Sequence, residues 1–215
     1  MSDWTQGYTT EIEYTYGYYS ELNPQRIRLA FAYNGLAFPE IGTACELGFG
    51  QGLGVNMHAA ASVVQWSGTD FNPSHTAFAA ELAHAAGASA RLYDQSFAEF
   101  ASRDDLPDFD YICLHGIFSW ISEANRAVIV DFVRRRLKVG GVLYISYNTL
   151  PGWAEFAPVQ HLISLYGKVH GSREQGMVAR VDDALGFTER LFKTQPGFAR
   201  ANPQAQARLE GLATQ

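Results

Sequence analysis

Hydrophobic residues in the middle of the chain gather in short continuous runs, and each run is followed by a longer, mixed segment. Short apolar runs bounded by glycine or polar residues indicate strands, whereas the longer segments indicate helices. Continuous rather than alternating apolar positions are typical of strands covered on both faces. The expected strands are residues 42–50, 65–71, 90–94, 109–116 and 142–148. This alternation predicts an α/β fold in which a parallel sheet lies between two helical layers.

Capping residues mark the ends of the helices that connect these strands. Pro73 falls in the first turn of one helix and Gly87 just beyond its end, where these residue types are favoured. Ser96 and Ser122 are placed to cap two further helices. The expected helices are residues 52–64, 72–87, 96–105 and 122–141, the last one ended by Gly140-Gly141.

The two ends of the chain differ from its middle. The N-terminal stretch holds five tyrosines between residues 8 and 19, whose rings could pack on the end of the sheet or form a lid. A helix pattern over 23–36 follows. Beyond Trp153 the patterns are helical and no strand is expected. The expected helices of this tail are residues 155–171, 173–194 and 202–213. We therefore divide the chain into a lid and helix (1–40), a core (41–153) and a helical tail (154–215).

Composition indicates an ordinary soluble globular protein. Hydrophobic residues make up 47% and charged residues 18% of the 215 positions, and no apolar run approaches the roughly 20 residues that cross a bilayer. The first residues lack the features of a secretory signal, and Cys45 and Cys113 sit in strand-like apolar runs. We therefore expect buried thiols, a cytoplasmic location and no membrane partner.

Charge argues against a nucleic-acid partner, because the net charge is −6 and such a partner needs a basic face. The dense basic cluster at residues 134–138 has two interpretations: the last turn of a helix, favoured by the helix dipole, or a phosphate-binding patch. The six histidines show no spacing typical of metal ligands, so we expect no metal site.

Four glycines at alternate positions follow an acid in the segment ELGFGQGLG, residues 46–54. A glycine-rich turn between a strand and a helix lets a ligand approach the main chain closely. The order here is E-x-G-x-G-x-G, from Glu46 through Gly48, Gly50 and Gly52, which differs from the G-x-G-x-x-G fingerprint of dinucleotide-binding folds. Parallel sheets bind ligands at the carboxyl ends of their strands, so the turn predicts a ligand site there.

Polar residues also close the next two strands. Asp70 ends the second strand, where a carboxylate can accept hydrogen bonds from two hydroxyl groups. Asp94 and Gln95 end the third strand. Each acid alone could merely belong to a helix cap. Acids at three consecutive strand ends favour one shared ligand.

The spacing from Glu46 to Gly52 resembles the first motif of class I S-adenosylmethionine (SAM) dependent methyltransferases. The resemblance implies a Rossmann-like sheet, SAM as cofactor and S-adenosylhomocysteine (SAH) as product. It implies that Glu46 helps hold the methionyl ammonium, that Asp70 accepts the ribose hydroxyls, and that the third strand end reads the adenine. The implied cofactor-binding residues are Glu46, Gly48, Gly50, Gly52, Asp70, Phe71, Asp94, Gln95, His115, Tyr14 and Tyr19.

Two longer segments, residues 14–36 and 109–153, narrow the resemblance. With the glycine motif they look like the N-terminal catalytic region of bacterial methyltransferases that contain a methyltransferase regulatory domain, a group that includes protein-lysine methyltransferases. A complete sheet of class I has seven strands, so we expect the chain to be truncated before the last two. The open sheet edge would then be covered by the tail helices or by a second copy in a homodimer.

Methyl transfer requires an acceptor held in line with the methyl donor and shielded from water. The candidates lie after the fourth and fifth strands: His115 as general base, Tyr147 and Asn148 to align the acceptor, and Trp120 and Trp153 as pocket walls. His115 could instead only bond the backbone, and the tryptophans could be core. The predicted function is methyl transfer from SAM to an amine or hydroxyl of a small molecule or a protein, for example a lysine. The alternative is a SAM-binding module of a larger protein without turnover.

Overall fold

The computed structural model describes residues 16–171 and 176–212. The chain forms two compact units, one up to Tyr147 and one from Asn148. The first is an α/β unit, and the described part of the second is built of helices. Most of the predicted lid, residues 1–15, lies outside the described residues.

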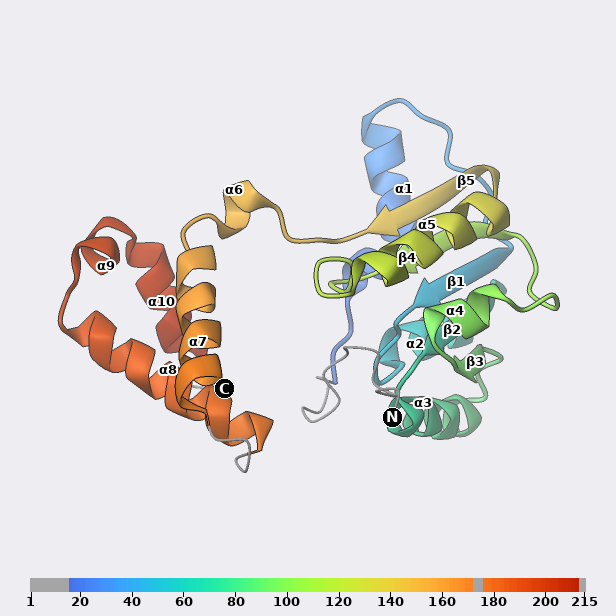
Figure 1. The fold of residues 1–215 in the computed structure, drawn as a ribbon. Coiled ribbons are helices and arrows are strands. Elements are labelled where there is room, and N and C mark those ends of the chain that lie inside the picture. Colours follow the sequence, from blue (N-terminus) through green and yellow to red (C-terminus); the bar gives the residue numbers. More distant parts are fainter. Residues whose placement is uncertain (1–15, 172–175, 213–215) are drawn as a thin grey trace. The chain divides into compact units, whose positions relative to one another are not determined.

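Within its described residues, the first unit contains a sheet of five parallel strands in the order β3-β2-β1-β4-β5 (Figure 1). The strands are β1 (Thr43–Leu47), β2 (Gln65–Asp70), β3 (Arg91–Asp94), β4 (Phe109–Leu114) and β5 (Leu137–Ile145). The predicted Rossmann-like sheet is therefore confirmed. The strand order reverses between β1 and β4, and sheets of this kind bind ligands outside the carboxyl ends of the strands at such a reversal.

Helices cover both faces of this sheet. The helices are η1 (Ser20–Leu22), α1 (Pro24–Tyr33), α2 (Leu53–Ala60), α3 (Pro73–Ala86), α4 (Phe97–Ala101) and α5 (Glu123–Arg136). The predicted caps form: the Ser122 hydroxyl accepts from the Asn125 N–H, and Ser96 with Glu99 forms a reciprocal capping box. The start of each of these helices is thereby fixed locally.

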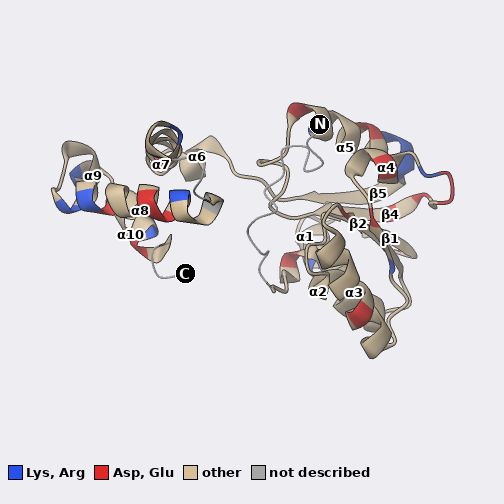
Figure 2. Ribbon diagram, turned by 60° about the horizontal axis from the view of Figure 1, so that its bottom comes forward, with Lys and Arg blue, Asp and Glu red and all other residues tan. Residues whose placement is uncertain are grey.

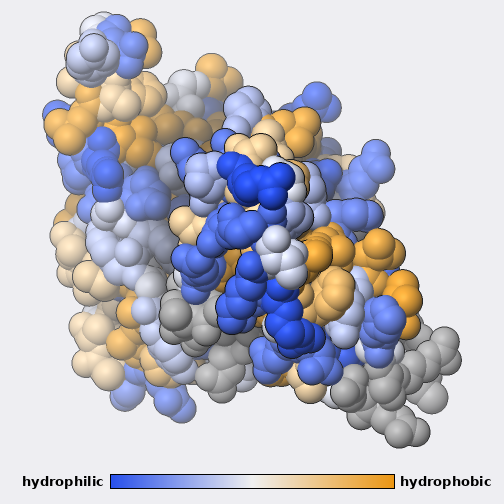
Figure 3. Space-filling model, turned by 90° about the vertical axis from the view of Figure 1, so that its left-hand side faces the viewer, coloured by the Kyte–Doolittle hydropathy of each residue, from blue (hydrophilic) through white to orange (hydrophobic). Residues whose placement is uncertain are grey.

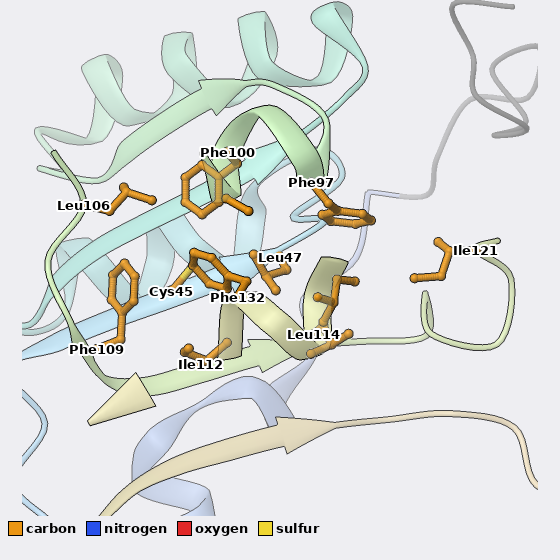
Figure 4. Packing of buried hydrophobic residues seen from close by; sticks show 12 residues of the cluster. Cys45, Leu47, Phe97, Phe100, Leu106, Phe109, Ile112, Leu114, Ile121 and Phe132 are labelled. Atoms are coloured by element: carbon orange, nitrogen blue, oxygen red, sulfur yellow. The ribbon is translucent and has the colours of Figure 1, made fainter. Parts of the chain in front are cut away.

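Alternate residues of the central strands face opposite helical layers. Ala44 packs with residues of α1, α2 and α3, whereas Cys45 and Leu47 pack with residues of α4 and α5. Figure 4 shows the second layer, in which Phe100 of α4 and Phe132 of α5 lie beside the sheet. Burial of each such side chain contributes about 1.5–3 kcal/mol, so this layer anchors both helices.

The helix predicted over residues 122–141 is too long. Leu137 already has the extended backbone (φ −82°, ψ 123°) of a strand, and α5 ends before it. Gly140 takes a left-handed conformation (φ 84°), which interrupts a helix. Beyond an irregularity in the pairing, Tyr111 of β4 faces Val142 of β5. Pairing with β4 thus starts the strand at Leu137 instead of Val142.

Arg135, Arg136 and Lys138 of the basic cluster contact neighbouring segments at the end of α5, where Lys and Arg are blue in Figure 2. Arg136 donates to the carbonyl of Leu106 (3.0 Å), and Lys138 Nζ lies 2.9 Å from Asp110 Oδ1. These contacts match the structural interpretation of the cluster, since its side chains hold the end of α5 against the loop before β4.

The second unit confirms the prediction of a helical tail. Its helices among the described residues are α6 (Leu150–Trp153), α7 (Ala157–His170), α8 (Met177–Lys193), α9 (Gly197–Ala201) and α10 (Pro203–Leu212). Phe156, Val159 and Phe192 belong to its small hydrophobic core. Figure 3 looks onto the second unit from the left-hand side of Figure 1. Hydrophilic side chains run down the middle of this view, and hydrophobic ones lie beside them. Within the described ranges, no helix has both the length and the apolar character that a bilayer span requires.

Candidate functional site

The carboxyl ends of β1, β2 and β3 lie side by side, because these strands are parallel and adjacent. The register places Glu46 opposite Gly68 and Asp70 opposite Asp94. The three acids that the sequence predicts to share a ligand therefore occupy the same edge of the sheet.

The turn after β1 is built on glycines with a left-handed backbone. Gly48, Gly50 and Gly52 have φ angles of 71°, 56° and 73°, a region that other residues rarely adopt. Side chains would also collide, since a Cβ atom at Gly52 would lie 2.4 Å from the Cβ atom of Ala79. The alternate spacing in the sequence thus reflects a backbone requirement at every second residue.

The N–H groups of these glycines are used within the protein. Gly48 donates to the carbonyl of Thr69 (2.8 Å), Gly50 donates to Asp70 Oδ2 (2.9 Å), and Gly52 also donates to a carbonyl of the turn. The turn is therefore tied to the end of β2. In this arrangement the main-chain N–H groups of the three glycines already have acceptors within the protein.

Glu46 is a buried carboxyl group with an unsatisfied oxygen. Its residue is 5% exposed, and Oε2 has no hydrogen-bond partner among the described residues. Burial, with a smaller contribution from the charge of Asp70, raises the pKa of Glu46 to about 8. A buried carboxylate is stable only when it is paired, so Glu46 is suited to a cationic or hydrogen-bond-donating ligand.

Asp70 is also buried, but its carboxylate has several partners. Oδ2 accepts from the N–H of Gly50, while Oδ1 accepts from the N–H of Asn72 (3.0 Å) and lies 3.2 Å from Nδ1 of His75. A carboxylate offers about four lone-pair positions, so three donors leave room for roughly one more. Asp70 therefore holds the glycine turn and the start of α3 in place, and it keeps a lone-pair position that can accept a hydrogen bond from a ligand.

The end of β3 presents a more exposed acid. Burial and the charges of Glu99 and Asp70 raise the pKa of Asp94. The main-chain N–H of Gln95 donates to the carbonyl of Asp70 (3.1 Å), which ties this end to β2. Asp94 and Gln95 therefore border the same edge as the glycine turn.

His115 follows β4 and is held by three side chains from two segments, the turn at η1 and the end of β5. Its ring stacks on Tyr19, with centroids 4.2 Å apart, and Nδ1 lies 3.1 Å from the hydroxyl of Ser146. Oε1 of Glu21 lies 3.7 Å from the same nitrogen. The Ser146 hydroxyl also accepts from the N–H of Gly116 (2.7 Å). These contacts engage Nδ1 of His115, and none of the hydrogen bonds found among the described residues involves Nε2.

The other predicted residues are distributed differently. Trp120 and Tyr147 are exposed in the first unit, at 57% and 59%, and Phe71 is partly buried. Asn148 and Trp153 belong to the second unit, where the guanidinium of Arg208 lies 4.1 Å from the centroid of Trp153. Tyr14 lies outside the described residues.

Sequence reasoning missed three neighbours of the site. Glu21 and Ser146 flank His115 although they are far from it along the chain, and no local pattern indicates them. His75, five residues after Asp70 in the first turn of α3, is not among the predicted site residues. Its position one turn into a helix that begins beside a buried acid was the signal that could have identified it.

Comparison with protein families places a known domain over this site. Residues 44–141 match a family model described as a methyltransferase domain. The match runs from β1 into β5, so it contains the glycine turn, Glu46, Asp70, Asp94 and His115.

Two curated bacterial proteins are similar in sequence. An uncharacterised protein of Synechocystis is 42% identical over 217 residues, covering 99% of this chain and 42% of that protein. An uncharacterised protein of Rickettsia prowazekii is 31% identical over 147 residues, covering 66% of this chain and 58% of that protein. The chain thus spans about two fifths of the first relative and under two thirds of the second.

A solved structure shares the fold. PKMT2 from Rickettsia typhi, in complex with AdoHcy, gives a TM-score of 0.71 at 21% identity, covering 90% of this chain and 38% of that chain. At this level of identity the comparison establishes a common fold.

Proposed function

We propose that this chain is a class I SAM-dependent methyltransferase, which transfers a methyl group from SAM to an amine or hydroxyl acceptor. The matched methyltransferase domain and the shared fold support the family. One observation carries the cofactor assignment: Glu46 is buried with an unpaired oxygen, directly before a turn of left-handed glycines. A ligand that presents a cation to this acid, and a slender chain to the bare turn, satisfies both features.

The methionyl end of SAM fits the acid at β1. Its ammonium would provide the charge partner that Glu46 lacks among the described residues, which offsets the cost of ionising a buried carboxyl group. The left-handed glycines add no side chain between the main chain of the turn and this end of the ligand. When bound, SAM supplies an electrophilic methyl group on a positively charged sulfur.

Asp70 and the end of β3 fit the nucleoside. One ribose hydroxyl can donate to the remaining lone pair of Asp70, and a second can replace its longest contact, the one with His75 at 3.2 Å. Asp94, beside Asp70 in the sheet register, is placed to accept a hydrogen bond from an adenine amino group. This assignment uses the three acids as the resemblance implies.

His115 is suited to remove a proton from the acceptor. If Nδ1–H donates toward Glu21 or Ser146, the other ring nitrogen, Nε2, is the basic one, and Glu21 stabilises the imidazolium that forms. Stacking on Tyr19 fixes the plane of the ring. Nε2 of His115 would take the proton that the acceptor loses when it is methylated. A protein lysine is one acceptor within this class.

Calorimetry with SAH tests the cofactor assignment. The wild-type chain should bind SAH, and Asp70→Ala should weaken binding by about 1.5–3 kcal/mol, the value of charge-assisted hydrogen bonds. Asp104→Ala, an exposed acid in the loop before β4, is the matched control and should bind like the wild type. Unchanged affinity in Asp70→Ala would remove the ribose role, and no SAH binding by the folded wild type would remove the proposed function.

A further inference from the structure

A cavity lies at the opposite end of β2 from the glycine turn. It is bordered by the first turns of α1, the segment before β1, and the stretch from the end of α2 to the start of β2. Its volume is about 430 Å³, within the range of roughly 300–1,000 Å³ that small-molecule sites occupy. The proposed SAM site does not use this cavity.

Two side chains in its wall carry unpaired buried nitrogens. Both ring nitrogens of His58 and Nε1 of Trp66 have no hydrogen-bond partner among the described residues. The two rings are neighbours, with centroids 5.1 Å apart, and the residues are 6% and 1% exposed. Most buried polar atoms in proteins are paired, so three unpaired nitrogens in one wall need an explanation.

The chemistry of these nitrogens specifies a complementary group. Burial lowers the pKa of His58 to about 4, so its ring is neutral at pH 7 and has one donor and one acceptor. The Trp66 indole is a donor only. A ligand edge that carries an acceptor next to a donor can pair with the indole N–H and with the bare imidazole nitrogen.

The rest of the lining favours a flat, uncharged molecule. Phe38, Pro39 and Val64 add apolar surface to the rings of His58 and Trp66. Arg28 and Glu40 also line the cavity, and because their charges are opposite they give it no net charge. An ionic group placed against the neutral imidazole would lose hydration without gaining a charge partner.

We propose that this cavity is a second small-molecule site, which takes a planar, uncharged ring compound with a hydrogen-bond donor and an acceptor on one edge. The ring lies against the apolar lining, and the polar edge pairs with Trp66 and His58. Because these nitrogens are buried, binding requires a rotation of the rings that brings them to the surface of the cavity. This site is independent of the proposed methyl transfer.

The test is an NMR titration of the whole chain at pH 7. The Trp66 indole N–H resonance is followed while nicotinamide, uracil or phenol is added singly, with benzoate as the charged comparison. At least one neutral probe should shift this resonance saturably with a Kd below about 1 mM, and benzoate should bind at least about 10-fold more weakly. No saturable shift with any neutral probe up to about 10 mM, or equal binding of benzoate, overturns the proposal.

Variants locate the binding. His58→Phe keeps the ring volume but removes both nitrogens, so the probe that binds should lose at least about 10-fold in affinity. His84→Phe, an exposed histidine of α3, is the matched control and should bind normally. Should His58→Phe misfold, His58→Gln supplies an amide donor and acceptor and should retain part of the affinity. Unchanged binding in a folded His58→Phe protein contradicts the assignment.

A competition separates this site from the cofactor site. The neutral probe should bind equally well with saturating SAH present and in Asp70→Ala. If SAH displaces the probe, the probe occupies the cofactor site, and the second-site proposal fails while the methyltransferase proposal stands. If SAH does not bind but the probe does, the methyltransferase proposal fails while the second-site proposal stands.

Discussion

Glu46→Gln tests whether a buried carboxyl group holds the cationic end of the cofactor. Burial, and to a lesser degree Asp70, raises the pKa of Glu46 to about 8, so about nine in ten molecules carry a proton there at pH 7. A bound ammonium requires the ionised form. Binding of SAH at pH 7 should therefore release about 0.9 proton per ligand from the wild type and close to none from Glu46→Gln.

Calorimetry in two buffers with different ionisation enthalpies measures this release directly. The same linkage makes wild-type affinity rise about 10-fold between pH 7 and pH 9, or about 1.4 kcal/mol, before titration of the ligand's own amine opposes it. The proton count at pH 7 is the cleaner quantity, because the amine remains mostly protonated there. SAH binding to the wild type without proton release, or equally tight binding by Glu46→Gln, would refute the reasoning.

The same residue predicts a pH dependence of stability. The folded-state pKa of Glu46 is raised above its ordinary value of 4.5, so the folded protein binds the proton more tightly than the unfolded chain. Its contribution is complete below about pH 4.5 and is lost as the pH rises to about 8. The difference is of the order of a few kcal/mol. Urea unfolding should show Glu46→Gln gaining stability relative to the wild type between pH 5 and pH 9.

Two further changes test the turn and the base. Gly52→Ala should destabilise the fold by more than about 2 kcal/mol in urea unfolding, because it adds a collision with Ala79 to an unfavourable φ. Gly35 has a φ of 67° and open space around it, so Gly35→Ala should cost only about 1 kcal/mol of stability. Equal losses would exclude the collision. In a methyl-acceptor screen, His115→Gln should lower kcat about 100-fold with SAH affinity nearly unchanged. If Asn148→Ala lowers the rate and His115→Gln does not, alignment without a base accounts for the chemistry.

The sequence was sufficient for features that local rules determine. Ser96 and Ser122 each cap the helix that they precede, because a cap depends on a few adjacent residues. Glu46, Asp70 and Asp94 could be grouped before the structure was known, since parallel strands bring their carboxyl ends to one edge. The sequence patterns therefore predicted the fold, and the sheet edge that is the candidate cofactor site, wherever neighbouring residues in the chain determine the structure.

The features that were missed depend on contacts between distant segments. Glu21 reaches His115 from the helical turn before α1, and Ser146 reaches it from the end of β5, so neither has a signal near His115 in the sequence. The end of α5 was placed too late because pairing with β4 draws Leu137 into the sheet. In each case a tertiary contact determined the outcome.

The two faces of the sheet differ in how many buried polar side-chain atoms lack a hydrogen-bond partner among the described residues. The aromatic layer around Phe100 and Phe132 contains none of the buried unpaired side-chain atoms found among the described residues (Figure 4). All five belong to β1, α2 or β2: Glu46 Oε2, Asn56 Oδ1, both ring nitrogens of His58, and Trp66 Nε1. At about 1–3 kcal/mol each, their combined cost would rival the 5–15 kcal/mol by which a domain is stable. Most of these atoms must therefore be paired in solution by ligands or water. The β1–α2–β2 segment, with the glycine turn at one end of α2 and the cavity of the proposed second site at the other, is where bound molecules should add most to stability.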